Sequence, residues 1–299
     1  MKKYLTIFAL LIFIAQPANA WDAGFPFLKQ DDKKAVQKVL KSQVKYANNA
    51  NYKKFIETYD PQYQNSDGFN LDTYISLVKE IWNTYHKIKY DIVIQDISID
   101  ENTAKVKLKE TAFAKISVSE PYDGELKSTA DTIYTLNKKD GKWKVVSDSV
   151  IDETTTMLYG DAKDLDIKLT VPNKIEANTE YCATLEFTPP AETIAIASIA
   201  SDLVEYPQKP TKEVFRAMPE DNILERLFTS NNQNKNEYIV ASIGLTKTSI
   251  CDLNIKLSLT GFGYKIKRVN VIKDDSKNLK EGINNSEKIL IEDKKDLNG

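Results

Sequence analysis

The sequence predicts an α+β domain followed by an all-β sandwich domain, and three observations support this prediction. Apolar residues recur with the helical period up to about residue 85, and from residue 88 they alternate as in half-buried strands. After residue 166 the helical period is nearly absent, and short apolar runs are separated by turn residues. We therefore expect three helices packed on an antiparallel sheet, and then roughly six or seven short strands in a sandwich.

Residues 1–20 predict a cleavable secretory signal. Lys2 and Lys3 give a positive start, the run from Leu5 to Ala15 is almost entirely apolar, and Ala18-Asn19-Ala20 provides a small-x-small site before Trp21. The apolar run is shorter than the roughly 20 residues that span a bilayer, which disfavours an uncleaved anchor. The site is followed directly by Trp21 and not by a lipid-carrying Cys, and no twin Arg is present, so we expect Sec-type export to the periplasm or the exterior of a bacterial cell.

The charge of the chain argues against a nucleic-acid partner. The chain has 41 basic and 43 acidic residues, and removal of the two lysines of the signal would change its net charge from −2 to −4. Nucleic-acid binding needs a concentrated basic face instead. No second apolar run of membrane length follows the signal, so no integral membrane segment is expected after cleavage.

Three helices are predicted after an extended lead-in at residues 21–29. The first begins at Asp31 and has one apolar face, a short second helix covers Tyr52 to Tyr59 before Pro61, and a third covers Asn70 to Tyr85. The apolar face of the first helix contains Val36, Val39, Leu40, Val44 and Ala47.

Long strands are predicted next. Alternation from Ile88 to Ile94 indicates one strand, and Ala104 to Val118 indicates another with a lysine-rich outer face. Thr129 to Leu136 and Lys142 to Ile151 form a further pair, joined through an Asp-Gly turn, which is a strong hairpin signal.

The order of these elements resembles the nuclear-transport-factor-2-like superfamily over about residues 30–157. The resemblance rests on the helix and strand order, the break at Pro61, and the closing arm Gly141-Lys142-Trp143-Lys144-Val145. It implies an α+β cone, in which helices pack on a curved antiparallel sheet, as in ketosteroid isomerase and many binding proteins. No local motif aligns with the catalytic residues of ketosteroid isomerase, so the resemblance assigns no catalytic residue.

Residues 158–165 are polar and contain a Gly, which is typical of a linker, and residues 166–273 form the predicted β-sandwich. Within it, Glu220 to Phe228 is expected to be a short helix or turn. The architecture resembles an immunoglobulin-like module of bacterial envelope proteins, without a motif that names a family. The charged tail at 274–299 is expected to be disordered, with a docking peptide as the alternative.

Cys182 and Cys251 are the two cysteines of the chain, and in an oxidising compartment such a pair usually forms a disulfide. We expect a bridge across the sandwich. The alternative is two separate buried thiols.

Catalytic and metal-binding motifs are not found. The single histidine, His86, lies at an element boundary without a nucleophile partner, and the acids of the linker lack the spacing of a calcium loop. Asp131 and Asp148 are weak catalytic candidates, because an acid that points into the cone would have a raised pKa. We expect both to face water instead. No cofactor and no metal site is predicted.

Aromatic residues provide a candidate ligand pocket in the first domain. The predicted pocket residues are Tyr59, Tyr134, Tyr46, Tyr90 and Phe69, whereas Trp82 and Tyr74 share the apolar helix face and are expected in the core. We therefore expect an exported, non-enzymatic protein that binds a small apolar ligand or an envelope protein. The alternatives are a cone-fold enzyme, such as an isomerase or dehydratase with a buried Asp, and a structural spacer or adhesion component.

Overall fold

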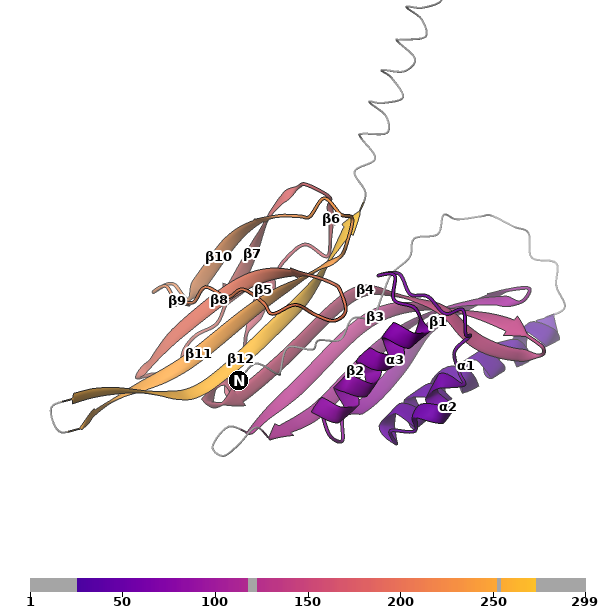
Figure 1. Ribbon diagram of the computed structural model, residues 1–299, viewed down its shortest axis with the longest axis horizontal. Helices are drawn as coiled ribbons and strands as arrows, with labels where there is room; N and C mark the ends of the chain where they lie inside the picture. The colour runs from indigo at the N-terminus through magenta and orange to yellow at the C-terminus, as the bar shows by residue number, and fades with distance from the viewer. Residues whose placement is uncertain (1–25, 118–122, 252–253, 273–299) are drawn as a thin grey trace, which may run out of the picture.

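The structure is a computed structural model that describes residues 26–117, 123–251 and 254–272. Its largest feature is a nine-stranded sheet with the order β1-β2-β3-β4-β12-β11-β8-β9, in which neighbours are antiparallel and β6 pairs in parallel with β12 (Figure 1). Its strands are β1 (Lys89–Asp100), β2 (Thr103–Ser117), β3 (Asp123–Lys139), β4 (Lys142–Gly160), β6 (Lys174–Glu176), β8 (Thr193–Leu203), β9 (Arg216–Ala217), β11 (Glu237–Cys251) and β12 (Asn254–Ile272).

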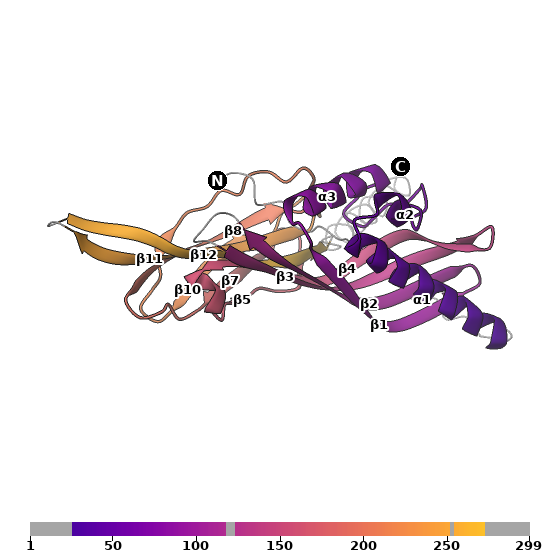
Figure 2. The same ribbon diagram turned by 90° about the horizontal axis from the view of Figure 1, so that it is seen from below.

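This continuous sheet corrects the predicted fold class. The prediction of an α+β cone followed by a separate all-β sandwich is wrong, because β4 pairs directly with β12. The pairing runs from Gly160 opposite Gly261 to Thr154 opposite Lys267, so the strands of both halves share one hydrogen-bonded ladder. Figure 2 shows the result as one elongated molecule, with helices at one end and the β11–β12 hairpin projecting at the other.

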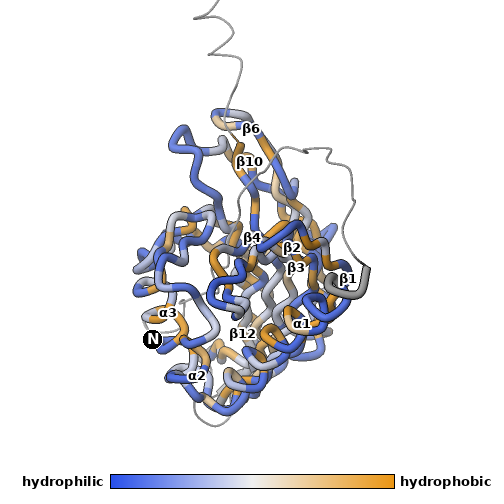
Figure 3. The backbone as a smooth tube through the Cα atoms, turned by 90° about the vertical axis from the view of Figure 1, so that its right-hand side faces the viewer, coloured by the Kyte–Doolittle hydropathy of each residue, from blue (hydrophilic) through white to orange (hydrophobic). Residues whose placement is uncertain are grey.

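Helices cover one face of the sheet over β1 to β4. They are α1 (Pro26–Asn48), α2 (Tyr52–Ile56) and α3 (Leu71–Thr84). The side chains of Asn51 and Asn70 cap α2 and α3 by accepting hydrogen bonds from Lys54 N and Thr73 N. Pro26 begins α1, so the described end of the predicted lead-in is helical. Figure 3 shows hydrophobic and hydrophilic segments alternating along the helices, as expected for helices with one buried face.

A second sheet with the order β10-β7-β5 packs near the other end of the molecule. Its strands are β5 (Lys168–Thr170), β7 (Glu180–Glu186) and β10 (Ile223–Thr229), so the segment expected as a short helix or turn is a strand. Successive residues of β11 point to opposite faces of the large sheet, so this strand contributes to two hydrophobic cores. Ile239 and Ala241 belong to the core that includes the second sheet, whereas Tyr238 and Val240 belong to the core beneath the helices.

The predicted linker at 158–165 is part of the folded structure. Residues 158–160 complete β4, and η1 (Asp161–Asp164) follows with Ala162 fully buried. Glycine is required in β12 where it pairs with the end of β4, since a Cβ on Gly261 would lie 2.5 Å from the backbone N of Ala162.

Several sequence predictions lie outside the described residues. These are the signal at 1–20, the lead-in up to residue 25, and the tail at 274–299. No helix in the described part of the chain is long and apolar enough to cross a membrane.

Candidate functional site

A cavity of about 100 Å³ lies between the helices and the sheet. The wall on the helix side is bulky and aromatic, whereas the wall on the sheet side includes Ala112, Ser128 and Ala130. These small side chains on neighbouring strands leave a space that the helical side chains do not fill. Other bordering residues are Leu40, Gln43, Val44, Ala47, Phe55, Tyr59, Tyr74, Leu77, Val78, Ile81, Trp82, Tyr90, Asp91, Ile92, Leu108, Glu110, Thr111, Tyr134 and Glu153.

Glu110 is a carboxyl group on the cavity wall. Every second residue of β2 points toward the helices, and Leu108, Glu110 and Ala112 are three of these residues. Glu110 is half-buried, and its exposed part faces the cavity. Its two oxygens accept hydrogen bonds from the hydroxyls of Thr132 (2.9 Å) and Tyr134 (3.0 Å). Burial raises the pKa of Glu110, although these two hydrogen bonds oppose the rise.

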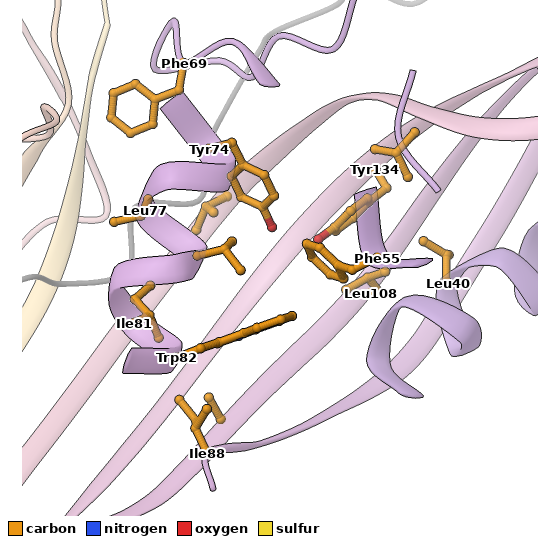
Figure 4. Close-up of a cluster of buried hydrophobic side chains, with 14 of the residues drawn as sticks. Leu40, Phe55, Phe69, Tyr74, Leu77, Ile81, Trp82, Ile88, Leu108 and Tyr134 are labelled. Atoms are coloured by element: carbon orange, nitrogen blue, oxygen red, sulfur yellow. The ribbon is translucent and has the colours of Figure 1, made fainter. Parts of the chain in front are cut away.

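Tyrosine hydroxyls surround the same space. Tyr59 donates to Tyr74 at 3.1 Å, and Figure 4 shows the hydroxyls of Tyr74 and Tyr134 directed toward the region between α3 and the sheet. Burial raises the pKa of Tyr134 well above its ordinary value, so its hydroxyl remains a protonated donor at neutral pH.

Asp148 is buried behind this group, with 1% of its surface exposed. The Tyr63 hydroxyl donates to its Oδ2 at 2.7 Å, and burial raises the pKa of Asp148 well above its ordinary value. The expectation that Asp148 faces water is therefore wrong. Asp148 does not border the cavity, however. Asp131 is half-buried, and it lies on the face of β3 that points away from the cavity.

A second buried acid, Glu153, borders the cavity from β4. It accepts a hydrogen bond from the Tyr238 hydroxyl at 3.0 Å, and burial raises its pKa to about 8 even though the nearby Arg268 opposes the rise. Arg268 is fully buried and forms a 2.7 Å ion pair with Asp67. The helical half and β12 therefore meet through a buried network of charged groups.

Gln43 contributes an unpartnered polar atom to the cavity. Its side chain is 6% exposed and borders the cavity from α1. Among the described residues, its Nε2 has no hydrogen-bond partner. A buried amide donor without a partner is costly, so this position favours an additional polar group in the cavity.

The predicted pocket residues fall into two groups. Tyr59, Tyr90 and Tyr134 border the cavity. Tyr46 and Phe69 do not border it. The ring of Tyr46 instead lies under the ammonium of Lys54, and Phe69 packs in the core. Trp82 and Tyr74, which were expected only to fill the core, border the cavity as well as being buried.

Sequence reasoning missed Glu110, Glu153 and Gln43. The alternation from Ala104 through Val106 and Leu108 could have identified Glu110, because it continues inward to position 110. Glu153 had no such signal, since β4 changes its alternation at a bulge between the pairs Asp131–Asp152 and Thr132–Val150.

The predicted disulfide is not formed in the structure. Cys182 is an exposed free thiol within β7, in the smaller sheet. Cys251 ends β11 at the tip of the projecting hairpin, opposite Asn254, and its side chain lies outside the described residues. The two positions thus lie on separate elements, one in each sheet.

Other candidate chemistry lies away from the cavity. His86 is exposed in the turn after α3, and Asp161 forms a 2.8 Å ion pair with Lys247. Within the described ranges, no group of three or more His, Cys, Asp or Glu side chains is placed to hold a metal ion.

Comparisons with known proteins give only distant likenesses. No family model and no curated protein matches the chain. A structure of Bd1075 from Bdellovibrio bacteriovorus matches with a TM-score of 0.35 and 15% identity, over 42% of this chain and 42% of that chain. AclR from Streptomyces galilaeus matches with a TM-score of 0.28 and 14% identity, over 38% of this chain and 77% of that chain. Neither likeness carries an argument about fold or activity, and the nuclear-transport-factor-2-like and immunoglobulin-like resemblances stay predictions.

Proposed function

We propose that this chain is an exported, non-enzymatic binding protein that holds a small, largely apolar molecule in the cavity beneath α1, α2 and α3. The observation that carries the proposal is the cavity itself, which has an apolar and aromatic lining and a few convergent polar groups, as ligand pockets do. The predicted signal at residues 1–20 supports export.

The size of the cavity limits the ligand. At about 100 Å³ it is smaller than the roughly 150 Å³ cavity that admits benzene in a well-studied protein core. The ligand is therefore a molecule of few heavy atoms, or a larger one that displaces the helices slightly on entry. Glu110 and Gln43 provide the polar contacts that would orient it.

The enzyme alternative has less support from the geometry. Asp148, the buried acid that could have acted as a base, lies behind Tyr63 and does not reach the cavity. Glu110 and Glu153 do border it, but hydroxyl donors bind both carboxyl groups and oppose the rise of their pKa, which weakens them as bases. An isomerase or dehydratase would need a base that is free to take a proton from a substrate in the cavity.

A cavity-filling substitution tests the binding proposal. Ala130→Leu places three additional carbons in the cavity, whereas Thr129→Leu, the matched control, adds apolar bulk on the exposed face of the same strand. We expect small neutral alcohols such as 3,3-dimethyl-1-butanol to shift amide resonances of residues around the cavity in the wild type and in Thr129→Leu, but not in Ala130→Leu. Shifts that persist in a folded Ala130→Leu protein would contradict binding in this cavity.

A further inference from the structure

We propose that the occupant of the cavity is a small organic ammonium ion, with Glu110 as its counter-ion and the aromatic side chains as its lining. This inference rests on the proposed binding function and specifies the chemical class of the ligand.

The first argument is an excess of buried carboxyl groups over cations. Glu110 and Glu153 border the cavity, and Asp148 and Asp67 are buried in the same core without bordering it. The one guanidinium in this region, Arg268, is already bound to Asp67 at 2.7 Å. Carboxyl groups outnumber cations here, and buried charges in proteins are normally paired.

Glu110 is the acid with no cation of its own. Among the described residues, no Lys or Arg nitrogen lies within 4.0 Å of its carboxyl group, and its hydrogen-bond partners are the uncharged hydroxyls of Thr132 and Tyr134. A cation in the cavity would provide the missing partner without displacing either hydroxyl, because each oxygen of a carboxylate can accept more than one hydrogen bond.

The second argument is the aromatic lining. Phe55, Trp82 and Tyr90 border the cavity, and the rings of Phe55 and Trp82 meet edge to face with centroids 5.5 Å apart. Ring faces attract organic cations, and groups of aromatic residues are a common means of binding quaternary ammonium ligands. An inorganic cation would be less well matched, since it prefers a full shell of oxygen ligands.

The third argument is the unpartnered amide of Gln43. Its buried Nε2 borders the cavity and needs an acceptor, which a hydroxyl or carbonyl oxygen on the ligand would supply. The cavity therefore fits an amino alcohol or a similar ammonium compound with one additional polar group.

Binding of such a cation has a defined pH dependence. Among the described residues, the titratable groups around Glu110 are the phenols of Tyr59, Tyr74, Tyr90 and Tyr134 and the carboxyls of Asp91, Asp148 and Glu153, and none of these is cationic. Burial raises the pKa of Glu110, so an empty cavity favours the protonated acid. A cation requires the ionised form. Affinity for a permanent cation should therefore rise as pH rises.

Choline and its neutral isostere 3,3-dimethyl-1-butanol provide the test. Calorimetry with the full chain should show that choline binds at least about tenfold more tightly than the neutral alcohol, because only choline pairs with the carboxylate. Choline affinity should increase with pH while that of the alcohol stays constant. Since choline itself does not titrate, such a change would report the acids of the protein. Binding of a short-chain phosphatidylcholine in place of free choline would overturn the assignment to a free ammonium ion.

Variants separate this inference from the proposed function. Glu110→Gln should weaken choline binding by about tenfold and leave the neutral alcohol unaffected, while Asp96→Asn, at an exposed acid on β1, should change neither. Equal affinity for the two probes, with both blocked by Ala130→Leu, would overturn the ammonium assignment and leave the binding function intact. Failure of both probes to bind the cavity would overturn both. If Glu110→Gln does not fold, the pH dependence of choline and 3,3-dimethyl-1-butanol binding to the wild type still tests the ammonium assignment.

Discussion

Asp67 and Arg268 form a buried ion pair of 2.7 Å, with 2% and 0% of their side chains exposed, although they lie 201 positions apart in the sequence. Asp67 precedes α3, whereas Arg268 lies near the end of β12. Arg268 also donates to the side chain of Asn270 at 2.8 Å, and Asn236 donates to Asp67. The pair therefore joins the helical end of the molecule to its C-terminal strand.

Removal of one partner of this pair should be strongly destabilising. Arg268→Met leaves the Asp67 carboxylate buried without a cation, and we expect the free energy of unfolding to fall by about 3–5 kcal/mol. Urea denaturation measures this loss. The double variant with Asp67→Asn should lose less than the sum of the single variants. As a control, Lys168→Met breaks an exposed pair with Glu186 and should cost less than about 1 kcal/mol.

The stability of the protein should fall as pH rises, in part because of Glu153. Burial raises the pKa of Glu153 from its ordinary value of 4.5 to about 8, so the folded state binds more protons than the unfolded state between these values. The contribution of this group decreases by on the order of 1 kcal/mol per pH unit within that window and is constant above it. Denaturant titrations of Glu153→Gln should show a flatter pH profile than the wild type or the exposed control Glu101→Gln. An unchanged profile would show that Glu153 ionises normally.

The contact between β12 and the end of β4 should tolerate no side chain at Gly261. A Cβ there would meet backbone atoms of Ala162, Asp161 and Tyr159 at 2.5–3.0 Å, and backbone cannot move aside as a side chain can. We expect Gly261→Ala to reduce the free energy of unfolding by about 1–3 kcal/mol or more. Gly244→Ala in β11 is the control, because its new Cβ would meet side chains rather than backbone, Ile196 at 3.1 Å and Leu259 at 3.8 Å. Similar losses for the two variants would contradict the close approach.

The helical half should not fold as an independent unit. A fragment of residues 21–160 loses β12, which hydrogen-bonds to β4, and loses Tyr238 and Val240 from the core beneath the helices. We expect the full chain to unfold in a single calorimetric transition, and the fragment to lack a cooperative one. Two separate transitions in the full chain, together with a cooperative fragment, would restore the independent domains that the sequence suggests.

The sequence predicted local structure well and long-range pairing poorly. The periods that indicated helices before residue 85 and strands from residue 88 correspond to α1 to α3 and to β1 to β4. The pairing of β4 with β12 has no local signal, because two edges of suitable register pair through backbone groups that every residue has. For this reason the two halves were predicted as separate domains.

The candidate site was predictable only where alternation is regular. Glu110 follows the inward positions of β2 without interruption. In β4, register shifts near Val145 and Val150 change which face each residue takes, so neither Asp148 nor Glu153 can be oriented by counting. Tyr46 and Phe69 show the limit of composition as a guide, since aromatic residues on the right elements need not border the cavity.

The strand order has a consequence for how the chain reaches its native state. The edge of β4 is complete at Gly160, but its partner β12 begins only at Asn254, after seven other strands have been made. Until β12 reaches it, β4 therefore presents unpaired backbone groups, and such edges are prone to pair with other molecules. Closure of this contact joins distant parts of the chain, which slows folding. Pairing of β12 with β4 is therefore expected among the later folding events, and the edge of β4 needs protection until it occurs.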